Sequence, residues 1–298
     1  MESIHGGRVL VTGATGFVGG HLVPELVLRG CDVTCLVRTG PGLPAPVKVV
    51  HGDINVPESL RELPRDWDYV IHLAGISIPA SINSEKGVLD SLGAAMAILE
   101  HLRSGRLLLV SSAHVYAPSP GVRTEESPIT PQGRYGMLKV LIEQTATYYR
   151  SRLDVRIARP FNHVGPGMRP ELLIPSALRR LATLGDGEPL VMNGFDSTRD
   201  FVDVRDVITA YLAILGADAA KNQCFNVSTG QGHSVRELLE ILMDVSGERH
   251  PIEFRSAPSS EDDNAFLVGS SAKLRAVTGW APRHDLRESC RAVVETSR

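Results

Sequence analysis

Short apolar runs rich in β-branched residues recur along the first 230 residues, and segments with helical periodicity separate them. Runs of this kind are typical of strands that are buried on both faces of a parallel sheet. Their alternation with amphipathic segments predicts a doubly wound α/β fold. The predicted strands are 8–12, 32–37, 47–51, 69–74, 106–111, 155–159 and 224–228, and the predicted helices are 19–29, 58–63, 88–102 and 135–151.

The character of the chain changes after about Gly165, where proline, glycine and turn residues become more frequent. Segment 207–229 interrupts this change, because it has the pattern of a helix and a strand that return to the main sheet. We therefore expect a main domain from residues 1–165 plus 207–229, and a smaller C-terminal α/β substrate-binding lobe from 166–206 plus 230–298. Ligands of open α/β sheets bind beyond the carboxyl ends of the strands, so the second lobe would close a cleft there.

Composition narrows the choice of partners and compartment. Of the 298 residues, 43% are hydrophobic and 22% are charged, and the net charge of −3 gives no reason to expect nucleic acid or an anionic membrane. No apolar stretch is long enough to span a bilayer, and none precedes the first strand as a signal peptide would. The four cysteines lack the spacing of a metal site, and we interpret Cys31 and Cys35 as core residues. We expect a protein of the reducing cytoplasm, without a metal.

The turn after the first predicted strand places Gly13, Gly16 and Gly19 at three-residue intervals before a helix. Gly13 permits a tight turn, Gly16 lets a diphosphate approach the backbone, and Gly19 lets the helix pack closely. The helix N-terminus offers free N–H groups and a partial positive charge to the phosphates. Because the triplet lies between a strand and an amphipathic helix, it predicts a Rossmann-type, NAD(P)-binding domain.

The spacing from Thr12 to Gly19 is TGxxGxxG, which resembles the extended short-chain dehydrogenase/reductases, the NAD-dependent epimerase/dehydratase family that acts on nucleotide sugars. The resemblance covers almost the whole chain. It implies that Asp53 and Ile54 flank the adenine and that the end of the fourth strand lies beside the cofactor. The implied cofactor-binding residues are Gly13, Thr15, Gly16, Phe17, Val18, Arg38, Asp53, Ile54, Leu73, Ala74, Gly75, Tyr135 and Lys139.

Arg38 follows the second predicted strand, where an acidic residue would bind the free ribose hydroxyls of NAD. Its guanidinium suits the additional phosphate of NADP, so we expect NADP(H) in preference to NAD(H). The alternative is a solvated arginine in a loop, with no part in the choice of cofactor.

Tyr135 and Lys139 lie four residues apart and therefore share one face of the predicted helix. Their place after the fifth strand resembles the YxxxK pair of short-chain reductases, which implies that Tyr135 exchanges a proton with the substrate and that Lys139 holds the nicotinamide ribose. The pKa of free tyrosine is about 10, and the Lys139 ammonium favours the tyrosinate. The family pattern S-x-x-V-Y selects Ser112, rather than its neighbour Ser111, as the hydroxyl that polarises the carbonyl. The alternative is a surface Tyr–Lys pair without chemistry.

Ala113 and His114 stand where the related nucleotide-sugar 4,6-dehydratases carry Asp-Glu, an acid and a base. A methyl group cannot protonate a leaving hydroxyl, so we do not expect dehydratase activity. The same two residues, together with Ser112, are expected to bind the substrate, although His114 has the alternative of being an incidental polar residue.

The stretch ARPFNHVGPG, residues 158–167, resembles the reductases that convert GDP-4-keto-6-deoxy-D-mannose to GDP-D-rhamnose. It implies that Asn162 hydrogen-bonds the substrate and that His163 lines the cleft. A second block, RDFVDVRDV at 199–207, implies that Arg199 faces the nucleotide diphosphate. In that block Asp203 and Asp206 are expected to cap the next helix.

The chain departs from those reductases at residues 259–264, which read SSEDDN where they usually carry Arg-Pro. It also has Asp90 where the family usually has asparagine. The nucleotide base, GDP or TDP, and the C4 stereochemistry of the product therefore stay open.

Three functions are compatible with these residues. The first is the NADPH-dependent reduction of the C4 ketone of a nucleotide-linked 4-keto-6-deoxyhexose, in deoxysugar biosynthesis. The second is a nucleotide-sugar 4-epimerase with tightly bound NAD, against which Arg38 argues. The third is a redox sensor without enzymatic activity, but such proteins usually lose the tyrosine or the lysine of the YxxxK pair.

The resemblance also implies a homodimer, which pairs through helices 88–102 and 135–151. The run 94–99 is rich in small apolar residues, which suits close packing between subunits. The same composition would serve a helix packed inside one subunit.

Overall fold

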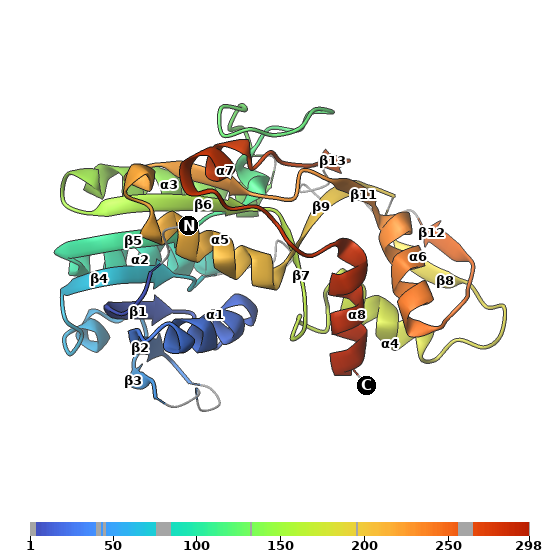
Figure 1. Ribbon diagram of the computed structural model, residues 1–298, viewed down its shortest axis with the longest axis horizontal. Coiled ribbons are helices and arrows are strands. Elements are labelled where there is room, and N and C mark those ends of the chain that lie inside the picture. The colour runs from blue at the N-terminus through green and yellow to red at the C-terminus, as the bar shows by residue number, and fades with distance from the viewer. Residues whose placement is uncertain are drawn as a thin grey trace.

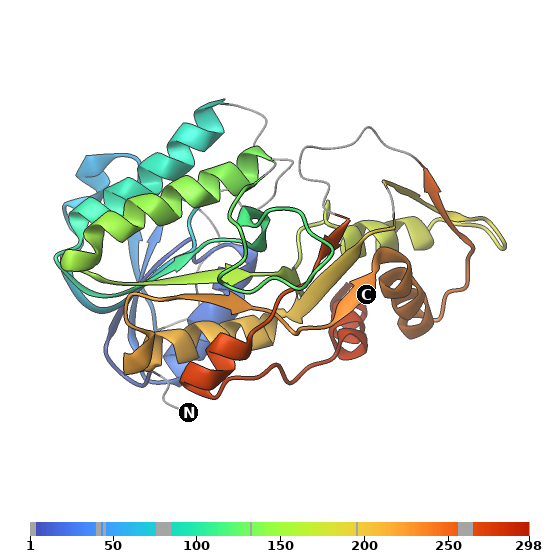
Figure 2. The same cartoon turned by 90° about the horizontal axis from the view of Figure 1, so that it is seen from above.

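Seven parallel strands form the main sheet of the computed structural model, in the order β10-β6-β5-β4-β1-β2-β3. Helices α1 and α5 cover one face and α2 and α3 the other (Figures 1 and 2), which confirms the doubly wound α/β prediction. The structure describes residues 4–39, 43, 46–75, 85–131, 133–194, 196–255 and 265–297.

The elements of the described chain are, in order, β1 Arg8–Thr12, α1 Phe17–Leu28, β2 Asp32–Val37, β3 Lys48–His51, η1 Pro57–Leu60, β4 Asp66–His72, α2 Glu85–His101, β5 Ser104–Val110, η3 Ala113–Val115, α3 Arg134–Tyr148, η4 Tyr149–Ser151, β6 Asp154–Pro160, β7 Asn162–Val164, α4 Leu173–Leu181, β8 Leu190–Asn193, β9 Thr198–Asp203, α5 Val204–Gly216, η5 Asp218–Ala220, β10 Cys224–Val227, β11 Gly232–Ser234, α6 Val235–Ser246, β12 Ile252–Arg255, β13 Phe266–Leu267, α7 Ala272–Thr278 and α8 Leu286–Ser297.

The strands of the main sheet begin and end within three residues of their predicted limits. The predicted helix 58–63 is wrong, because a single 3₁₀ turn, η1, occupies most of that segment. A segment this short forms too few backbone hydrogen bonds to offset the cost of helix nucleation.

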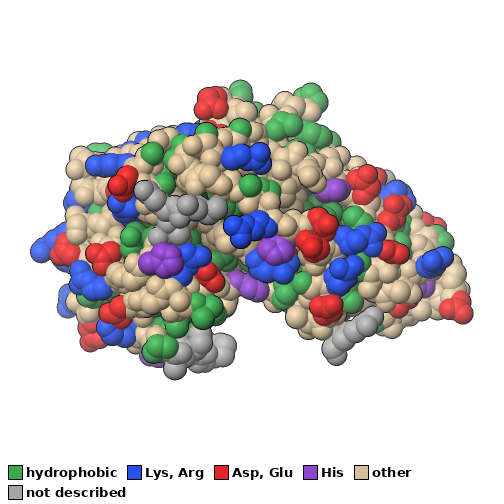
Figure 3. Space-filling model, viewed as in Figure 1, with side chains coloured by type: hydrophobic (Ala, Val, Ile, Leu, Met, Phe, Trp, Pro, Cys, Tyr) green, Lys and Arg blue, Asp and Glu red, His purple; other side chains and the backbone are tan. Residues whose placement is uncertain are grey.

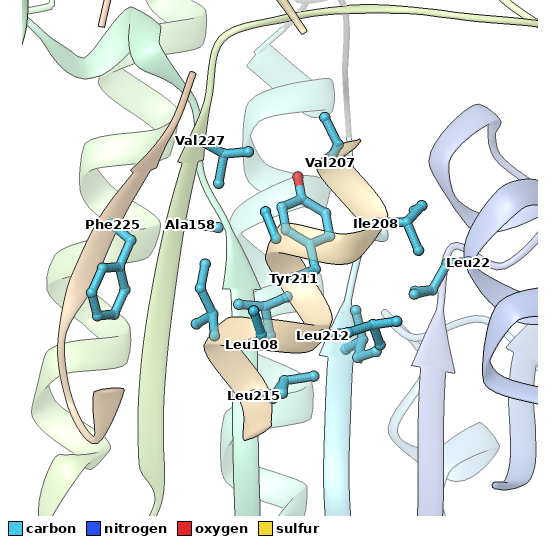
Figure 4. Packing of buried hydrophobic residues seen from close by; sticks show 14 of the residues in the cluster. Leu22, Leu108, Ala158, Val207, Ile208, Tyr211, Leu212, Leu215, Phe225 and Val227 are labelled. Atoms are coloured by element: carbon cyan, nitrogen blue, oxygen red, sulfur yellow. The ribbon is translucent and has the colours of Figure 1, made fainter. Parts of the chain in front are cut away.

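The main core lies between the sheet and helix α5, whose residues from Ala210 to Leu215 are almost wholly buried. Tyr211 and Leu212 point from α5 toward the sheet, where the cluster includes Leu108, Ala158 and Phe225 (Figure 4). Burial of these side chains supplies the main free energy that holds the helix on the sheet. Cys31 and Cys35 belong to the same cluster, as expected for core residues.

A second, smaller sheet has the order β11-β9-β13, with β7 also paired to β9, and β8 pairs with β12 beside it. Helices α4, α6 and α8 pack around a separate apolar core in this part of the molecule (Figure 1). The chain enters the second sheet at Asn162 and leaves it at Asp203, which is the N-cap of α5. The division into two domains stays a prediction, and these strand assignments favour crossings near residues 161 and 204 over 165 and 207.

Charged side chains are mixed on the surface. Basic and acidic residues alternate over the face shown in Figure 3, in keeping with the small net charge. Within the described segments, every helix is too short or too polar to cross a lipid bilayer.

Candidate active site

A cavity of about 760 Å³ opens at the carboxyl ends of β1, β4 and β5 and extends to the second sheet. Its walls contain every residue predicted to bind cofactor or substrate, with the exception of Arg199. Apolar and polar groups alternate around it, as in sites for large amphipathic ligands. The predicted residues that line it are Gly13, Thr15, Gly16, Phe17, Val18, Arg38, Asp53, Ile54, Leu73, Ala74, Gly75, Ser112, Ala113, His114, Tyr135, Lys139 and Asn162.

The glycine turn is packed too tightly for side chains at two of its three glycines. At Gly13, where φ is +75°, a Cβ atom would lie 2.7 Å from the backbone nitrogen of Ala74. At Gly19 it would lie 2.4 Å from the carbonyl oxygen of Gly13 and 2.6 Å from that of Ala14. Gly13 thus lets β1 and β4 end side by side, and Gly19 lets α1 rest directly on the turn.

Helix α1 begins at the cavity with its backbone N–H groups directed toward it. Its N-cap is Gly16, which makes no side-chain capping bond, and its first turn contains no acidic residue. The first N–H groups of an α-helix have no partner within the helix, and they carry the positive end of its dipole. These residues therefore fit the diphosphate of a dinucleotide.

The far end of the cavity contains Arg38 and Asp53. Arg38 is exposed, directly after β2. Asp53 accepts a hydrogen bond from the backbone N–H of Asn55 at 2.9 Å, and its own N–H donates to Ser59 Oγ at 3.1 Å. A fixed turn with a carboxylate and a nearby guanidinium suits the adenosine half of a dinucleotide phosphate.

The predicted hydroxyl and the predicted tyrosine meet because of another glycine. A Cβ atom at Gly136 would lie 2.2 Å from the carbonyl oxygen of His114, so α3 begins in direct contact with η3. Tyr135 and Ser112 therefore line the same stretch of wall. Ser112 Oγ accepts the N–H of His114 at 3.2 Å, which leaves its own proton for an acceptor in the cavity.

Lys139 lies one turn further along α3, beneath the Tyr135 ring, with its Nζ 5.6 Å from the ring centroid. It donates a hydrogen bond to the carbonyl oxygen of Val110, the last residue of β5, at 3.1 Å. Burial lowers the pKa of Lys139 to about 8, against the opposing effect of the Glu143 carboxylate. The side chain therefore carries most of its charge at neutral pH but is close to losing it.

Three histidines at or beside the cavity are neutral, and burial lowers the pKa of one of them, His163, to about 4. Burial, and then the charge of Lys139, lower the pKa of His72 to about 3. Its Nδ1 is 2.8 Å from Thr12 Oγ1, which ties the ends of β4 and β1 together. Burial, and then the charge of Arg199, lower the pKa of His114 to about 4, and its ring stacks edge-on against Tyr135 at 5.6 Å between centroids.

The second sheet contributes Asn162 and His163 to the cavity wall. The Nδ1 atom of His163 is buried and has no protein partner in the described chain. Arg199, predicted to bind the substrate, does not line the cavity: its Nη1 donates to the carbonyl oxygen of Thr198 at 3.1 Å. Its side chain nevertheless lies near enough to His114 to lower that pKa.

The cavity also contains residues that the sequence reasoning did not select. Ser111, treated as a neighbour of Ser112, lines the cavity with a buried Oγ that has no hydrogen-bond partner among the described residues. Asp90, noted only as a departure, lies inside α2 and lines it as well. Asn55 and the exposed Arg169 were missed, and a signal for Arg169 existed, because it follows the Gly165–Gly167 turn into the second lobe. The departure at residues 259–264 lies outside the described residues.

Two further aspartates, Asp203 and Asp206, were expected to cap a helix rather than to contact a ligand. Asp203 accepts the N–H of Arg205 at 2.8 Å and so caps α5, as predicted. Asp206 instead accepts the N–H groups of Arg283 and His284, each at 2.9 Å, and so fastens the approach to α8.

Comparison with known proteins agrees with this geometry. Residues 9–228 match the model of the NAD dependent epimerase/dehydratase family. The chain is 32% identical to a GDP-6-deoxy-D-mannose reductase of Pseudomonas aeruginosa, over 96% of each chain. It is 30% identical to a UDP-glucose 4-epimerase of Corynebacterium glutamicum, over 94% of this chain and 92% of that one.

Two solved structures extend the comparison. RMD from Pseudomonas aeruginosa, in complex with NADPH, superposes with a TM-score of 0.82 at 30% identity, over 97% of this chain and 98% of that one. MoeE5, in complex with UDP-glucuronic acid and NAD, superposes with a TM-score of 0.84 at 29% identity, over 98% of this chain and 99% of that one. These relatives include a complex with each nicotinamide cofactor.

The glycine contacts generate a direct test. We expect Gly19→Ala to weaken NADPH binding at least about tenfold, because its methyl group forces α1 away from the turn that holds the phosphates. Gly20→Ala is the matched control on the same helix, since a Cβ there meets nothing within 4 Å. Fluorescence titration of NADPH measures both dissociation constants, and equal values for the two variants would contradict this account of the turn.

Proposed function

The chain belongs to the NAD dependent epimerase/dehydratase family, and on this premise we propose that it reduces the C4 ketone of a nucleotide-linked 4-keto-6-deoxyhexose with NADPH. That it is a nucleotide-sugar enzyme follows from the family and its relatives. The observation that carries the finer proposal is Arg38 at the adenosine end of the cavity, where NAD would require a carboxylate. Use of NADPH favours net reduction over a reaction that returns its cofactor unchanged.

The proposed reaction needs a hydride at C4 and a proton at its oxygen. The nicotinamide supplies the hydride when it is bound. Ser112, whose Oγ already accepts the N–H of His114, donates its own proton in a hydrogen bond to the ketone oxygen. Tyr135 gives its proton to that oxygen as the alcohol forms.

The environment of Tyr135 favours loss of this proton. The Lys139 ammonium lies 5.6 Å from the ring centroid and stabilises the negative phenolate. Tyr135 is also in the first turn of α3, so the positive end of the helix dipole acts in the same direction. Lys139 has further N–H groups with which to hold the nicotinamide ribose.

A UDP-glucose 4-epimerase is the second candidate, because relatives of that name are about as similar as the reductase. It would use the same Ser112, Tyr135 and Lys139 and retain NAD between turnovers. If the purified protein contains bound NAD, that result would support the epimerase. Stoichiometric consumption of NADPH would support the reductase.

The first experiment offers NADPH with GDP-4-keto-6-deoxymannose, TDP-4-keto-6-deoxyglucose or UDP-glucose. We expect stoichiometric loss of NADPH absorbance with one of the 4-keto sugars, which also identifies the nucleotide. Tyr135→Phe should lower kcat by about 10²–10⁴-fold, the usual contribution of a general acid. Tyr148→Phe, on the same helix and 83% exposed, is the matched control and should retain wild-type kcat. Epimerisation of UDP-glucose without NADPH consumption would refute the proposal.

The cofactor preference has a separate test in Arg38→Ala. We expect its NADPH dissociation constant to rise about 10- to 100-fold, the value of one lost charged hydrogen-bond pair. NADH lacks the additional phosphate and serves as the internal control, so its dissociation constant should stay within about twofold. An unchanged NADPH constant would show that Arg38 is a solvated loop residue.

We also propose a homodimer through α2 and α3, which lie side by side on one face of the molecule (Figure 2). The run 94–99, first considered for this interface, packs mostly inward, because Ala94, Ala95, Ile98 and Leu99 are buried in the main domain. Four apolar residues left exposed on these helices support the proposal instead: Leu89, Met96, Met137 and Leu141.

Light scattering after size exclusion tests this interface. Leu141→Glu should convert the dimer to a monomer, since a buried unpaired carboxylate costs several kilocalories per mole, on the order of a whole weak interface. Leu28→Glu, at an 82% exposed position on α1, is the matched control and should leave the mass unchanged. A wild-type monomer, or a dimer in both variants, would contradict the proposed interface.

A further inference from the structure

A buried polar network lies behind the proposed catalytic residues and joins four elements. Arg159 Nε and Nη2 donate to the two carboxylate oxygens of Glu143 at 2.9 and 2.7 Å, and each side chain is 5% exposed. Arg159 Nη1 donates to Tyr116 Oη at 3.1 Å, and Tyr116 Oη donates to Asn226 Oδ1 at 2.6 Å. Each hydrogen bond fixes the direction of the next.

The network continues to the loop between η3 and α3. Asn226 Nδ2 donates to the carbonyl oxygen of Arg123 at 3.0 Å, and the Asn226 N–H donates to Glu125 Oε1 at 2.7 Å. Asn226 therefore holds both Tyr116, at the start of that loop, and two of its later residues.

Each member is a short step along the chain from a proposed site residue. Glu143 follows Lys139 by four residues on α3, so the two side chains share one face of the helix. Tyr116 ends the turn that starts at Ser112. Arg159 lies on β6, three residues before Asn162. The network thus connects the helix, the loop and the strand that together form the reactive end of the cavity.

Stability alone gives little reason for such a network. Removing two charges from water costs about as much as their attraction returns, and apolar replacements of similar volume are often equally stable. A buried carboxylate also requires a compensating charge, which Arg159 supplies here through two hydrogen bonds. The arrangement has a clear consequence, however: it keeps a negative charge one turn from Lys139.

Lys139 depends on the charge of Glu143 more than on that of Asp90, the other carboxylate in this part of the cavity. Burial lowers its pKa to about 8, and Glu143 is the group that opposes this shift. The His72 imidazole on β4 is neutral, and β5 contributes a carbonyl oxygen. The remaining polar groups around the same part of the cavity are Asp90 and Ser91 on α2, Ser111 and Ser112 after β5, and Tyr135 on α3 itself.

We propose that Arg159, Glu143, Tyr116 and Asn226 form a positioning network, which keeps Lys139 charged and holds the Ser112 loop in register with α3. Its catalytic consequence depends on the proposed roles of Ser112, Tyr135 and Lys139. None of the four residues lines the cavity. They act through the residues that do.

The effect of Glu143 on the charge of Lys139 is tested by NMR titration of the full-length protein labelled with ¹³C-lysine. The chain has five lysines, Lys48, Lys86, Lys139, Lys221 and Lys273, and Lys139→Arg identifies the signal of interest. We expect Lys139 to titrate near pH 8 in the wild type. In Glu143→Gln its midpoint should fall by at least about half a pH unit, since loss of a negative neighbour favours the neutral amine. The other four lysines should not move, and an unchanged Lys139 midpoint would overturn the electrostatic part of the proposal.

The second part of the proposal, that the network positions the Ser112 loop, is tested by measuring the turnover of substrate by the Tyr116→Phe variant. This substitution removes one hydroxyl and keeps the ring. We expect kcat to fall about tenfold while the KM for NADPH stays within about twofold, because Ser112 is displaced and the cofactor residues are not. Tyr149→Phe is the matched control: it removes a hydrogen bond to Glu100 at the other end of α3 and should retain wild-type kcat. Wild-type kcat in Tyr116→Phe would overturn the positioning role.

The NMR titration and the turnover measurement together distinguish failure of this inference from failure of the proposed function. The NMR midpoint needs no substrate, so it decides the role of Glu143 even if the wild type reduces no 4-keto sugar. That last result would count against the proposed function alone. If Glu143→Gln does not fold, Glu143→Asp takes its place in the titration, because the shorter side chain moves the carboxylate away from Lys139. A lower Lys139 midpoint there supports the electrostatic part of the proposal, and a midpoint identical to the wild type refutes it.

Discussion

The contact between backbones at the glycine turn determines where the site lies. Gly13 brings the ends of β1 and β4 within van der Waals distance, and Gly19 seats α1 on the carbonyl oxygens of the same turn. No side chain fits at either point, so the helix N-terminus has one available position relative to the sheet edge. The cofactor cradle, the direction of α1 and the packing of its buried face all follow from that position.

A second contact of the same kind sets the reactive end of the cavity. Gly136 presses the start of α3 against the carbonyl oxygen of His114, so the helix that carries Tyr135 and Lys139 cannot shift relative to the turn that starts at Ser112. Backbone contact determines how close the two pieces come, but it leaves their rotation to side chains. The buried hydrogen bonds from Glu143 through to Tyr116 constrain that remaining freedom.

The main sheet was predictable from sequence because most of its strands, unlike the edge strand β3, are buried on both faces and form apolar runs. The second sheet was not, because its strands are short and pair across long separations: β7, Asn162–Val164, pairs with β9, Thr198–Asp203. Motifs located nearly all of the cavity lining, since they specify positions along the chain. A motif does not determine side-chain direction, so Arg199 lies near His114 without lining the cavity, and small apolar residues such as the run 94–99 suit an internal contact as well as an intermolecular one.

His114 bears on the expectation that this site supports reduction rather than elimination of water. Its imidazole packs edge-on against the Tyr135 ring, and burial, followed by the charge of Arg199, lowers its pKa to about 4. Near neutral pH it therefore has no acidic proton to give a leaving hydroxyl, and the Ala113 methyl beside it has none either. In the proposed reaction, proton transfer at this end of the cavity falls to Tyr135, whose phenolate is favoured by Lys139 and by the start of α3. One proton donor is enough for that reaction, because a ketone takes up one hydride and one proton.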